Sequence, residues 1–332
     1  MKLPTDIKKI IVFRALQLGD MLCHVPAMRA LRHAYPNASI TLAGLPWAKS
    51  FTERFNNYFD DFIWFPGYPG LPEQPVDPVL FASFLNKVQN RHFDLALQMQ
   101  GNGTIVNAMI ALFEAHYTAG FFLPDDYAPN LEYFLAYPDY GSEIERHLLL
   151  MDYLGIPSQG TQLEFPITPQ DQHDYETLQL ALAPKQYVCI HPGSRGAWRQ
   201  WPIAHFAALA DYAVECGFKA AITGTREEAD IVAAVIGQMR EPAINLAGLT
   251  NLGAMGILIK NAYALISNCT GVSHMAAAFQ TPSIVISMDG EPQRWGPLNK
   301  KLHRTINWLE NDDFDAVKKQ AIDLLSVSQV SL

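Results

Sequence analysis

Residues 264–287, ALISNCTGVSHMAAAFQTPSIVIS, decide the fold class of this chain. An apolar run at 264–267 enters a glycine turn, a helical pattern follows at 272–279, and a second apolar run occupies 283–287. Short β-rich runs on either side of one helix predict parallel strands joined by a helix. Such strands are buried on both faces, because helices cover each side of a parallel sheet. The stretch therefore predicts an α/β fold.

The same alternation runs through the whole second half of the chain. Thr225 and Glu228 have the spacing of a capping box just ahead of an apolar-periodic run, which marks a helix start. The other strands are expected at 187–190, 220–223 and 243–246, and the other helices at 203–216, 226–239 and 252–260.

The first half repeats this plan more loosely. Residues 66–78 hold five prolines and two glycines, which favours an ordered but irregular surface loop, expected near the rim of the site. Strands are expected at 10–13, 40–43, 62–65 and 95–99, with helices near 23–34 and 104–114.

A boundary between two domains is expected near residue 160. The helix expected at 143–154 ends at Gly155 with Pro157 behind it, and Thr168-Pro169 begins the next helix. We predict domains at 1–160 and 161–332, both doubly wound (Rossmann-like) with parallel sheets, and the last helix as a candidate to pack back on the first. Two such domains in tandem place a cleft between them, with the loops at the carboxyl ends of both sheets facing it.

Composition excludes several functions. The net charge is −9, and Lys and Arg form no cluster longer than pairs such as Lys8-Lys9, whereas nucleic-acid binding needs clustered cations. The four cysteines form no CxxC pair and the histidines have no ligand-like spacing, which argues against a metal site and favours a reducing compartment. The apolar run at 10–13 is too short for a signal sequence, and no apolar run is long enough to span a bilayer. We expect a cytoplasmic protein with at most peripheral membrane contact.

The segment RALQLGD, residues 14–20, follows the first expected strand. A strand that runs into a glycine turn places the next carboxylate at the top edge of the sheet. Asp20 is therefore a candidate general base for an acceptor hydroxyl. The alternative is that Asp20 only caps the helix that begins near Pro26 and Ala27.

Two strand-to-helix loops in the second half are candidate phosphate sites. In residues 191–202, HPGSRGAWRQWP, small residues admit an anion and Arg195 and Arg199 supply positive charge near a helix N-terminus. In residues 267–274, SNCTGVSH, the Thr270 hydroxyl and the following N–H groups could hold phosphate, with His274 one turn further. The alternatives are a loop whose tryptophans merely pack and a structural histidine. Residues 289–297, DGEPQRWGP, form a rigid loop that lines the cleft or is a plain loop.

Taken together and in order, these segments resemble the ADP-heptose:lipopolysaccharide heptosyltransferases of glycosyltransferase family 9. The resemblance covers roughly residues 9–300, and its specificity lies in the ordered set. The marks are Leu18-Gly19-Asp20 with Pro26-Ala27, Phe93-Asp94, Gln100-Gly101, Glu145-Arg146, Leu154-Gly155, His191-Pro192-Gly193, Trp201-Pro202, Thr270-Gly271 with His274, and Arg294-Trp295-Gly296-Pro297.

The resemblance implies a GT-B fold and inverting transfer of a sugar, usually a heptose from an ADP-linked donor, without a metal or other cofactor. It implies that Asp20 is the general base and that the acceptor, a cell-envelope saccharide such as a lipopolysaccharide core or another glycan, meets the first domain. The residues it places on the acceptor side are Arg14, Gln17 and Gln100. Those it places on the donor side are Ser194, Arg195, Arg199, Cys269, Thr270, Gly271 and His274, with Glu227 or Glu228 near the nucleoside.

Two residues depart from the family pattern. Arg199 stands where Lys is common, which keeps the charge and changes the geometry of phosphate contact. Cys269 stands where Asp is usual before Thr-Gly, and a thiol reproduces neither the charge nor the two acceptors of a carboxylate. Cys269 favours the alternative of a non-catalytic GT-B protein that binds a nucleotide or glycan, whereas Asp20 favours an enzyme. An epimerase would need a second carboxylate in the cleft, and the sequence offers no convincing one.

Overall fold

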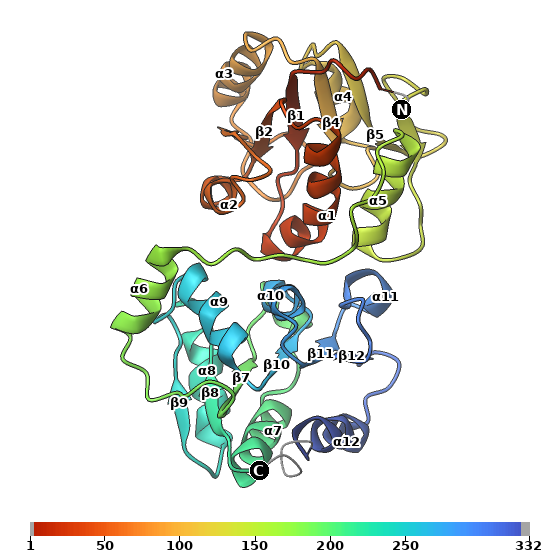
Figure 1. Ribbon diagram of the computed structural model, residues 1–332. Coiled ribbons are helices and arrows are strands. Elements are labelled where there is room, and N and C mark those ends of the chain that lie inside the picture. The colour runs from red at the N-terminus through yellow and green to blue at the C-terminus, as the bar shows by residue number, and fades with distance from the viewer. Residues whose placement is uncertain (1–2, 327–332) are drawn as a thin grey trace. The chain divides into compact units, whose positions relative to one another are not determined.

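The computed structural model describes residues 3–326, and the chain divides into two compact units, Met1–Gln162 and Leu163–Leu332 (Figure 1). The first unit contains a six-stranded, all-parallel sheet in the order β3-β2-β1-β4-β5-β6. Its strands are β1 (Lys9–Phe13), β2 (Ser39–Gly44), β3 (Asp61–Trp64), β4 (Leu95–Gln98), β5 (Tyr117–Phe122) and β6 (Phe134–Ala136). Its helices are α1 (Leu18–Ala34), α2 (Ala48–Arg54), α3 (Pro78–Gln89), α4 (Val106–Ala111) and α5 (Glu143–Tyr153).

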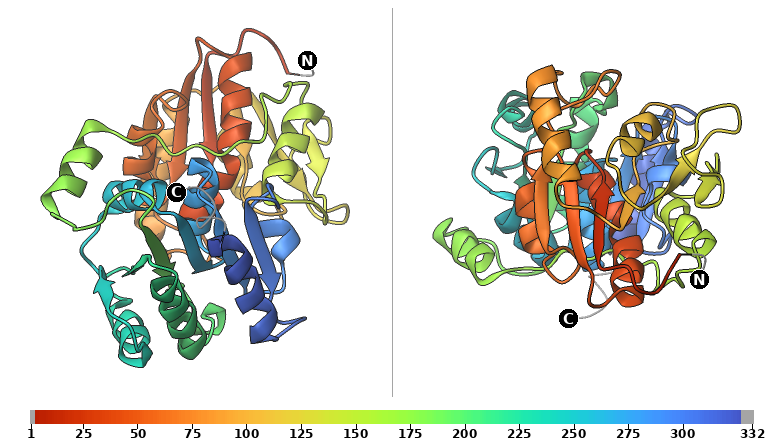
Figure 2. Two further views of the ribbon diagram at one scale, coloured as in Figure 1. Left: turned by 60° about the horizontal axis from the view of Figure 1, so that its bottom comes forward. Right: turned by 90° about the horizontal axis from the view of Figure 1, so that it is seen from above.

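Helices cover both faces of the first sheet. On one face, α3 and α4 place Phe84 and Ile110 in a buried cluster with Phe13 and Phe65. On the other face, α1 and α5 pack against each other, and the right-hand view of Figure 2 shows α3 across the sheet from α1. The central strands β1, β2 and β4 are buried on both sides, as their near-continuous apolar runs predict.

The second unit repeats the architecture with the strand order β12-β11-β10-β7-β8-β9, again all parallel. Its strands are β7 (Tyr187–His191), β8 (Lys219–Ile222), β9 (Ala243–Asn245), β10 (Ala264–Asn268), β11 (Ser283–Ser287) and β12 (His303–Asn307). Its helices are α6 (Pro169–Thr177), α7 (Ile203–Glu215), α8 (Ala229–Gln238), α9 (Leu252–Asn261), α10 (Gly271–Phe279), α11 (Pro292–Trp295) and α12 (Phe314–Leu325), with a short 3-10 turn at Ala197–Arg199.

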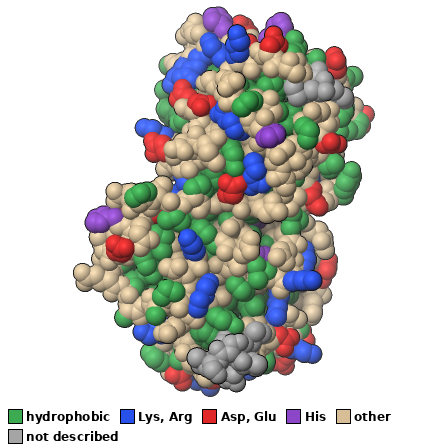
Figure 3. Space-filling view, viewed as in Figure 1, with side chains coloured by type: hydrophobic (Ala, Val, Ile, Leu, Met, Phe, Trp, Pro, Cys, Tyr) green, Lys and Arg blue, Asp and Glu red, His purple; other side chains and the backbone are tan. Residues whose placement is uncertain are grey.

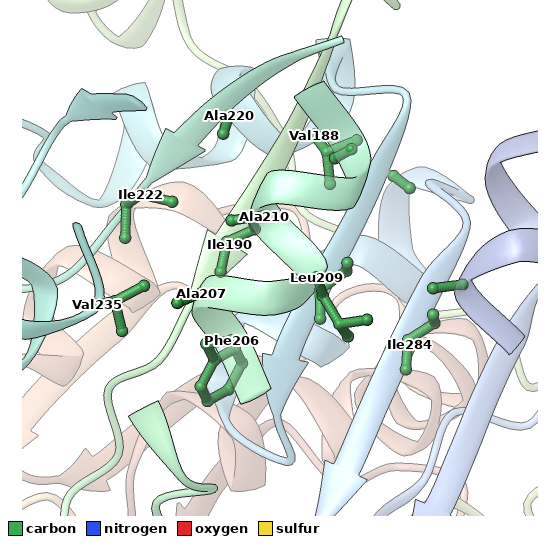
Figure 4. Close-up of a cluster of buried hydrophobic side chains, with 14 of the residues drawn as sticks. Val188, Ile190, Phe206, Ala207, Leu209, Ala210, Ala220, Ile222, Val235 and Ile284 are labelled. Carbon is green, nitrogen blue, oxygen red and sulfur yellow. The ribbon is translucent and has the colours of Figure 1, made fainter. Parts of the chain in front are cut away.

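The core of the second unit lies between its sheet and the helices α7, α8 and α12. Figure 4 shows α7 lying across the strands, with Phe206 and Leu209 pointing into the cluster that holds Ile190, Ile222 and Ile284. Complete burial of such a side chain stabilises the fold by about 1.5–3 kcal/mol. Helix α12 packs on α7 within this unit.

The strand order fixes where a ligand site can form in each unit. In the first sheet the chain continues outward on one side of β1 and returns on the other side at β4, and in the second sheet the same happens between β7 and β10. In open parallel sheets, ligands bind beyond the carboxyl ends of strands at such a switch point. The relevant ends are paired in register, Phe13 with Gln98 and Ser267 with His191.

Most element boundaries agree with the sequence predictions, and the differences have physical reasons. Helix α1 begins at Leu18 and contains Pro26, so the prediction of a start near residue 23 was wrong and Asp20 lies within the helix. Helix α8 begins at Ala229, three residues later than predicted, because only half of the expected capping box forms: Glu228 accepts the N–H of Thr225 at 2.8 Å. The helix end at Gly155 (φ +75°) and the N-cap at Thr168 were predicted correctly.

Several elements carry too weak a pattern for the sequence to predict. Strand β6 has three residues and β12 reads HRTIN, with one apolar residue among five. Helix α3 follows the proline-rich loop, where Asp77 caps it by accepting the N–H groups of Val79 and Leu80. Within residues 3–326, no helix has both the length and the apolar character that crossing a membrane requires.

Candidate functional site

The loop between β1 and α1 and the end of β4 bring together the predicted residues of the first unit. Gln100 is buried, and its Oε1 accepts the N–H of Ala15 at 2.6 Å, which ties the two loops at the switch point. Gln17 is the N-cap residue of α1, half-buried, and its side chain makes no capping hydrogen bond. Asp20 follows in the first turn of the same helix.

Arg14 lies beneath the start of α1 with none of its surface exposed. Its Nε and Nη2 donate to the carbonyl oxygen of Asp20 at 3.1 and 2.9 Å. Its Nη2 also contacts Glu143 Oε1 at 3.2 Å, and Nη1 contacts the Met99 carbonyl and lies 3.0 Å from His147 Nε2. All of its nitrogens are therefore engaged inside the first unit. Arg14 holds the backbone at Asp20 in place, which differs from the direct acceptor contact expected of it.

The Asp20 carboxyl sits in a setting that suits proton transfer. Burial raises the pKa of this carboxyl above its usual value, the Arg14 guanidinium opposes the increase, and the neighbouring Glu143 carboxylate adds to it. The backbone N–H groups of Asp20 and Gln17 favour the ionised form. A carboxylate with a raised pKa is a stronger base, which brings it closer to the range where proton abstraction at neutral pH is efficient. Gln17, not Asp20, is the N-cap residue of α1. The Asp20 carboxylate nevertheless interacts with the Gln17 N–H, so part of the capping role considered for Asp20 is present.

In the second unit, Asn268 joins the two loops at the switch point. Its Nδ2 donates to the carbonyl oxygens of Pro192 and Gly193 at 2.8 and 3.3 Å, and its Oδ1 accepts the N–H of Trp201 at 3.0 Å. Asn268 was not among the predicted site residues, although it belongs to the SNCTGVSH motif. Its position at the carboxyl end of β10 was the available signal.

Three buried hydroxyls at this edge have no hydrogen-bond partner among the described residues 3–326: Ser194 Oγ, Ser267 Oγ and Thr270 Oγ1. Thr270 is the N-cap residue of α10, yet its side chain makes no capping bond. Gly271 begins the helix, and His274 is buried at its fourth position. Buried polar groups are normally hydrogen-bonded, so unpartnered hydroxyls at a helix N-terminus fit a polar ligand such as phosphate.

Arg199 supplies positive charge at the same edge and is about one-third exposed (31%). Its Nη2 lies 2.5 Å from Asp289 Oδ2 and 3.4 Å from the carbonyl oxygen of Cys269. Arg195 is exposed on the preceding loop. Lys and Arg side chains elsewhere on the face of the second unit drawn in Figure 3 are scattered among other residue types.

The two glutamates proposed for the nucleoside differ in their surroundings. Glu228 Oε2 lies 3.7 Å from His191 Nε2, and a Cβ atom at Gly193 would lie 2.2 Å from the Glu228 carboxyl carbon. Gly193 therefore allows this carboxylate to reach the end of β7. Glu227 is exposed, and hydrogen bonds from its own N–H and from Thr225 lower the pKa of its carboxyl. Glu228 thus lies beside the loop after β7, whereas the Glu227 side chain is exposed to solvent.

Cys269 is a buried, neutral thiol. Burial raises its pKa to about 12, with a further contribution from the Asp289 carboxylate. Its Sγ donates to the Trp295 carbonyl oxygen at 3.6 Å. The thiol is therefore protonated at neutral pH and is not a nucleophile.

A resident metal ion has no obvious ligand set in the described part of the chain. Between residues 3 and 326, no group of three or more His, Cys, Asp or Glu side chains is arranged to hold one. The second-unit site instead gathers hydroxyls, a guanidinium and a helix N-terminus, which are groups that bind anions directly.

The model of glycosyltransferase family 9 (heptosyltransferase) matches residues 81–323. Lipooligosaccharide heptosyltransferase 2 of Haemophilus influenzae is 32% identical over 132 residues, which are 38% of this chain and 38% of that protein. The match thus spans well under half of that relative's length.

Solved structures resemble the whole chain. A glycosyltransferase family 9 protein from Veillonella parvula has a TM-score of 0.78 at 20% identity, covering 98% of each chain. ADP-heptose lps heptosyltransferase II from Escherichia coli has a TM-score of 0.73 at 19% identity, covering 97% of this chain and 100% of that one. At such low identity this likeness establishes the fold, which is the predicted GT-B class of two parallel-sheet domains.

Proposed function

Since the chain belongs to glycosyltransferase family 9, the heptosyltransferase family, we propose that it is an inverting glycosyltransferase that uses a nucleotide-sugar donor. The observation that carries the proposal is that two buried hydroxyls, Ser194 Oγ in the loop after β7 and Thr270 Oγ1 at the N-terminus of α10, have no hydrogen-bond partner within residues 3–326. A diphosphate would satisfy both. Fold alone would not support this step, because one fold hosts many functions.

The second unit would hold the donor. Ser194, Thr270 and the N–H groups that begin α10 would bind the diphosphate, and Arg199 would stabilise its charge as the sugar bond breaks. Arg195, Gly271 and His274 would be further donor contacts, and Glu228, which lies beside His191, would meet the nucleoside rather than Glu227. Cationic and N–H donors can perform this role without a metal, so we propose a metal-independent transfer.

The first unit would supply the base. Asp20 would accept the proton of the acceptor hydroxyl as that oxygen attacks the anomeric carbon from the face opposite the diphosphate, which inverts the centre. Gln17 would contact the acceptor, while Arg14 and Gln100 would fix the backbone around Asp20.

The relatives' names point to the substrates. We propose an ADP-linked heptose as donor and a lipopolysaccharide-core or similar cell-envelope saccharide as acceptor, used at the cytoplasmic side of the membrane. The net charge of −9 argues against strong attraction to an anionic membrane, so contact with it would be peripheral.

A second candidate is a non-catalytic GT-B protein that binds a nucleotide or glycan. Cys269 in place of the usual Asp favours it. The raised pKa of the Asp20 carboxyl favours the enzyme, because a pure binding protein has no need of a base with that property.

Asp20→Asn separates the two candidates. The variant should bind ADP as the wild type does and lose transfer by about 100-fold or more, the usual contribution of a general base. Asp6→Asn, an exposed position in the same unit, is the control that should keep full activity. Turnover is measured with the donor in excess and binding by calorimetry. Unchanged turnover in Asp20→Asn would exclude Asp20 as the base, and nucleotide binding without any transfer by the wild type would favour the second candidate.

A further inference from the structure

The loop after β11 holds a carboxylate that the sequence motifs did not assign. Asp289 is buried, with 8% of its side chain exposed, and both of its oxygens are fixed. Oδ1 accepts the Ser287 hydroxyl at 2.6 Å and the Glu291 N–H at 3.2 Å, and Oδ2 meets Arg199 Nη2 at 2.5 Å. Although burial alone would raise it, the pKa of the Asp289 carboxyl is lowered by these hydrogen bonds and by Arg199. The group is therefore a preorganised anion.

Asp289 engages only one nitrogen of the Arg199 guanidinium. Both hydrogen bonds of Arg199, to Asp289 and to the Cys269 carbonyl, use Nη2. In the described residues 3–326, Nη1 and Nε have no protein hydrogen-bond acceptor, and the guanidinium lies 5.5 Å from the ring centre of Trp198. The planar group is thus held at Nη2, and the N–H groups of Nη1 and Nε remain available as donors to phosphate oxygens.

The neighbouring Cys269 cannot supply a carboxylate of its own. Its thiol donates to the Trp295 carbonyl, so position 269 is built for a hydrogen-bond donor. A carboxylate there would face that carbonyl oxygen and lie beside Asp289, since the two side chains interact electrostatically. The carboxylate of this site is therefore Asp289 in the loop after β11, and position 269 after β10 has none.

We propose that Asp289 is a positioning residue of the donor site, which replaces the acid missing at Cys269 and orients Arg199 so that its remaining N–H groups, on Nη1 and Nε, bind the donor diphosphate. The inference rests on the proposed function. It explains why Arg and Cys occur together in this chain. A lysine at 199 has one compact ammonium, which Asp289 would retain, whereas a guanidinium can bridge a carboxylate and a phosphate.

The test is a double-mutant cycle between positions 199 and 289, read as the Kd for ADP by isothermal titration calorimetry. In the wild-type background, Arg199→Lys should weaken ADP binding by about tenfold or more, because the ammonium stays with Asp289 and charge-assisted hydrogen bonds to phosphate are lost. In the Asp289→Asn background, the same substitution should cost less than about threefold, because the ammonium is free to reach the phosphate.

The coupling is read from the cycle: Arg199→Lys should cost at least about threefold less in the Asp289→Asn background than in the wild type, a difference that a purely structural role for Asp289 would not produce. Asp289→Ser provides a second background should Asp289→Asn unfold. Asp211→Asn is the matched control, since Asp211 pairs with Arg240 at 3.1 Å on a different part of the same unit and its loss should leave the Arg199→Lys effect unchanged.

Each result has a distinct meaning. An equal cost of Arg199→Lys in all backgrounds, with ADP binding by the wild type intact, would overturn the role of Asp289 and leave the proposed function standing. A wild-type protein that binds no nucleoside diphosphate would overturn the proposed donor site and this inference together.

Discussion

Glu143→Gln removes one buried charge and should change both stability and the pH dependence of transfer. Glu143 Oε1 lies 3.2 Å from Arg14 Nη2, and the two side chains are 5% and 0% exposed. The same oxygen lies 3.6 Å from His147 Nε2. Glutamine keeps the shape and one acceptor but leaves the guanidinium without its buried counter-charge.

The loss of stability follows from that unpaired charge. Removing one partner of a buried ion pair costs about 3–5 kcal/mol. Because the Gln oxygen can still accept from Arg14, we expect the low end, about 3 kcal/mol. For a unit of this size the thermal transition should fall by roughly 6–12 °C.

The effect on pH dependence comes from Asp20. The Glu143 carboxylate contributes to the raised pKa of the Asp20 carboxyl, so its neutralisation should lower that pKa. A base acts only when deprotonated, and kcat/KM rises with pH through its pKa. The acid limb of the Glu143→Gln profile should therefore lie at a lower pH than that of the wild type.

The assay combines scanning calorimetry with a pH profile of kcat/KM. Asp152→Asn, exposed on the same helix α5, controls for the change of charge and should alter neither readout appreciably. An acid limb that stays in place or moves to higher pH would refute the electrostatic coupling of Glu143 to Asp20. A thermal transition unchanged within 1 °C or so would refute the buried ion pair as a stabilising contact.

Two further predictions concern stability. Burial lowers the pKa of His303 to about 4, whereas the pKa of this side chain in the unfolded state is near 6.5, so the unfolded state binds the proton first as pH falls. The free energy of unfolding should therefore be unaffected by His303 above about pH 6.5. It should decrease between pH 6.5 and pH 4, by no more than about 3 kcal/mol. Urea unfolding of His303→Asn, which keeps an acceptor for Ser283, should show a flatter pH dependence, and an unchanged slope would contradict this. Ser142→Ala removes the hydroxyl that accepts the Glu145 N–H at 3.2 Å and should cost about 1 kcal/mol in the same assay, whereas no loss would mean that the capping box is not stabilising.

The fold could be predicted from the sequence where apolar runs alternate with helical patterns. Strand β11 has the predicted bounds, and the C-terminal glycine of α5 and the Thr168 cap were evident because their chemistry is local. Helix α1 was predicted to begin too late because Pro26 was treated as a first-turn residue. Proline is unfavourable inside a helix, and the packing of the buried loop around Arg14 compensates for this cost. Such tertiary contacts leave no local pattern.

The sequence allowed us to predict which loops form the site, but not all the contacts that their residues make. Thr270 and Ser194 follow strands at the switch point, so their positions came from the order of motifs and strands. The complete burial of Arg14 was not foreseen, because its partners Met99, Glu143 and His147 lie more than 80 residues away in sequence. The loop that contains Asp289 was identified, but the role of Asp289 was not predicted for the same reason, since its contact with Arg199 joins residues 90 positions apart.

Titration of the wild-type protein with ADP, UDP, GDP and CDP by isothermal calorimetry tests the central claim, a nucleotide-sugar donor site at the N-terminus of α10, most directly. The account predicts that ADP binds in preference to the other three and that Thr270→Val, which removes only the unpartnered hydroxyl, weakens ADP binding by at least about tenfold. Binding of none of the four nucleotides at millimolar concentration, or equal ADP affinity in Thr270→Val, would contradict it.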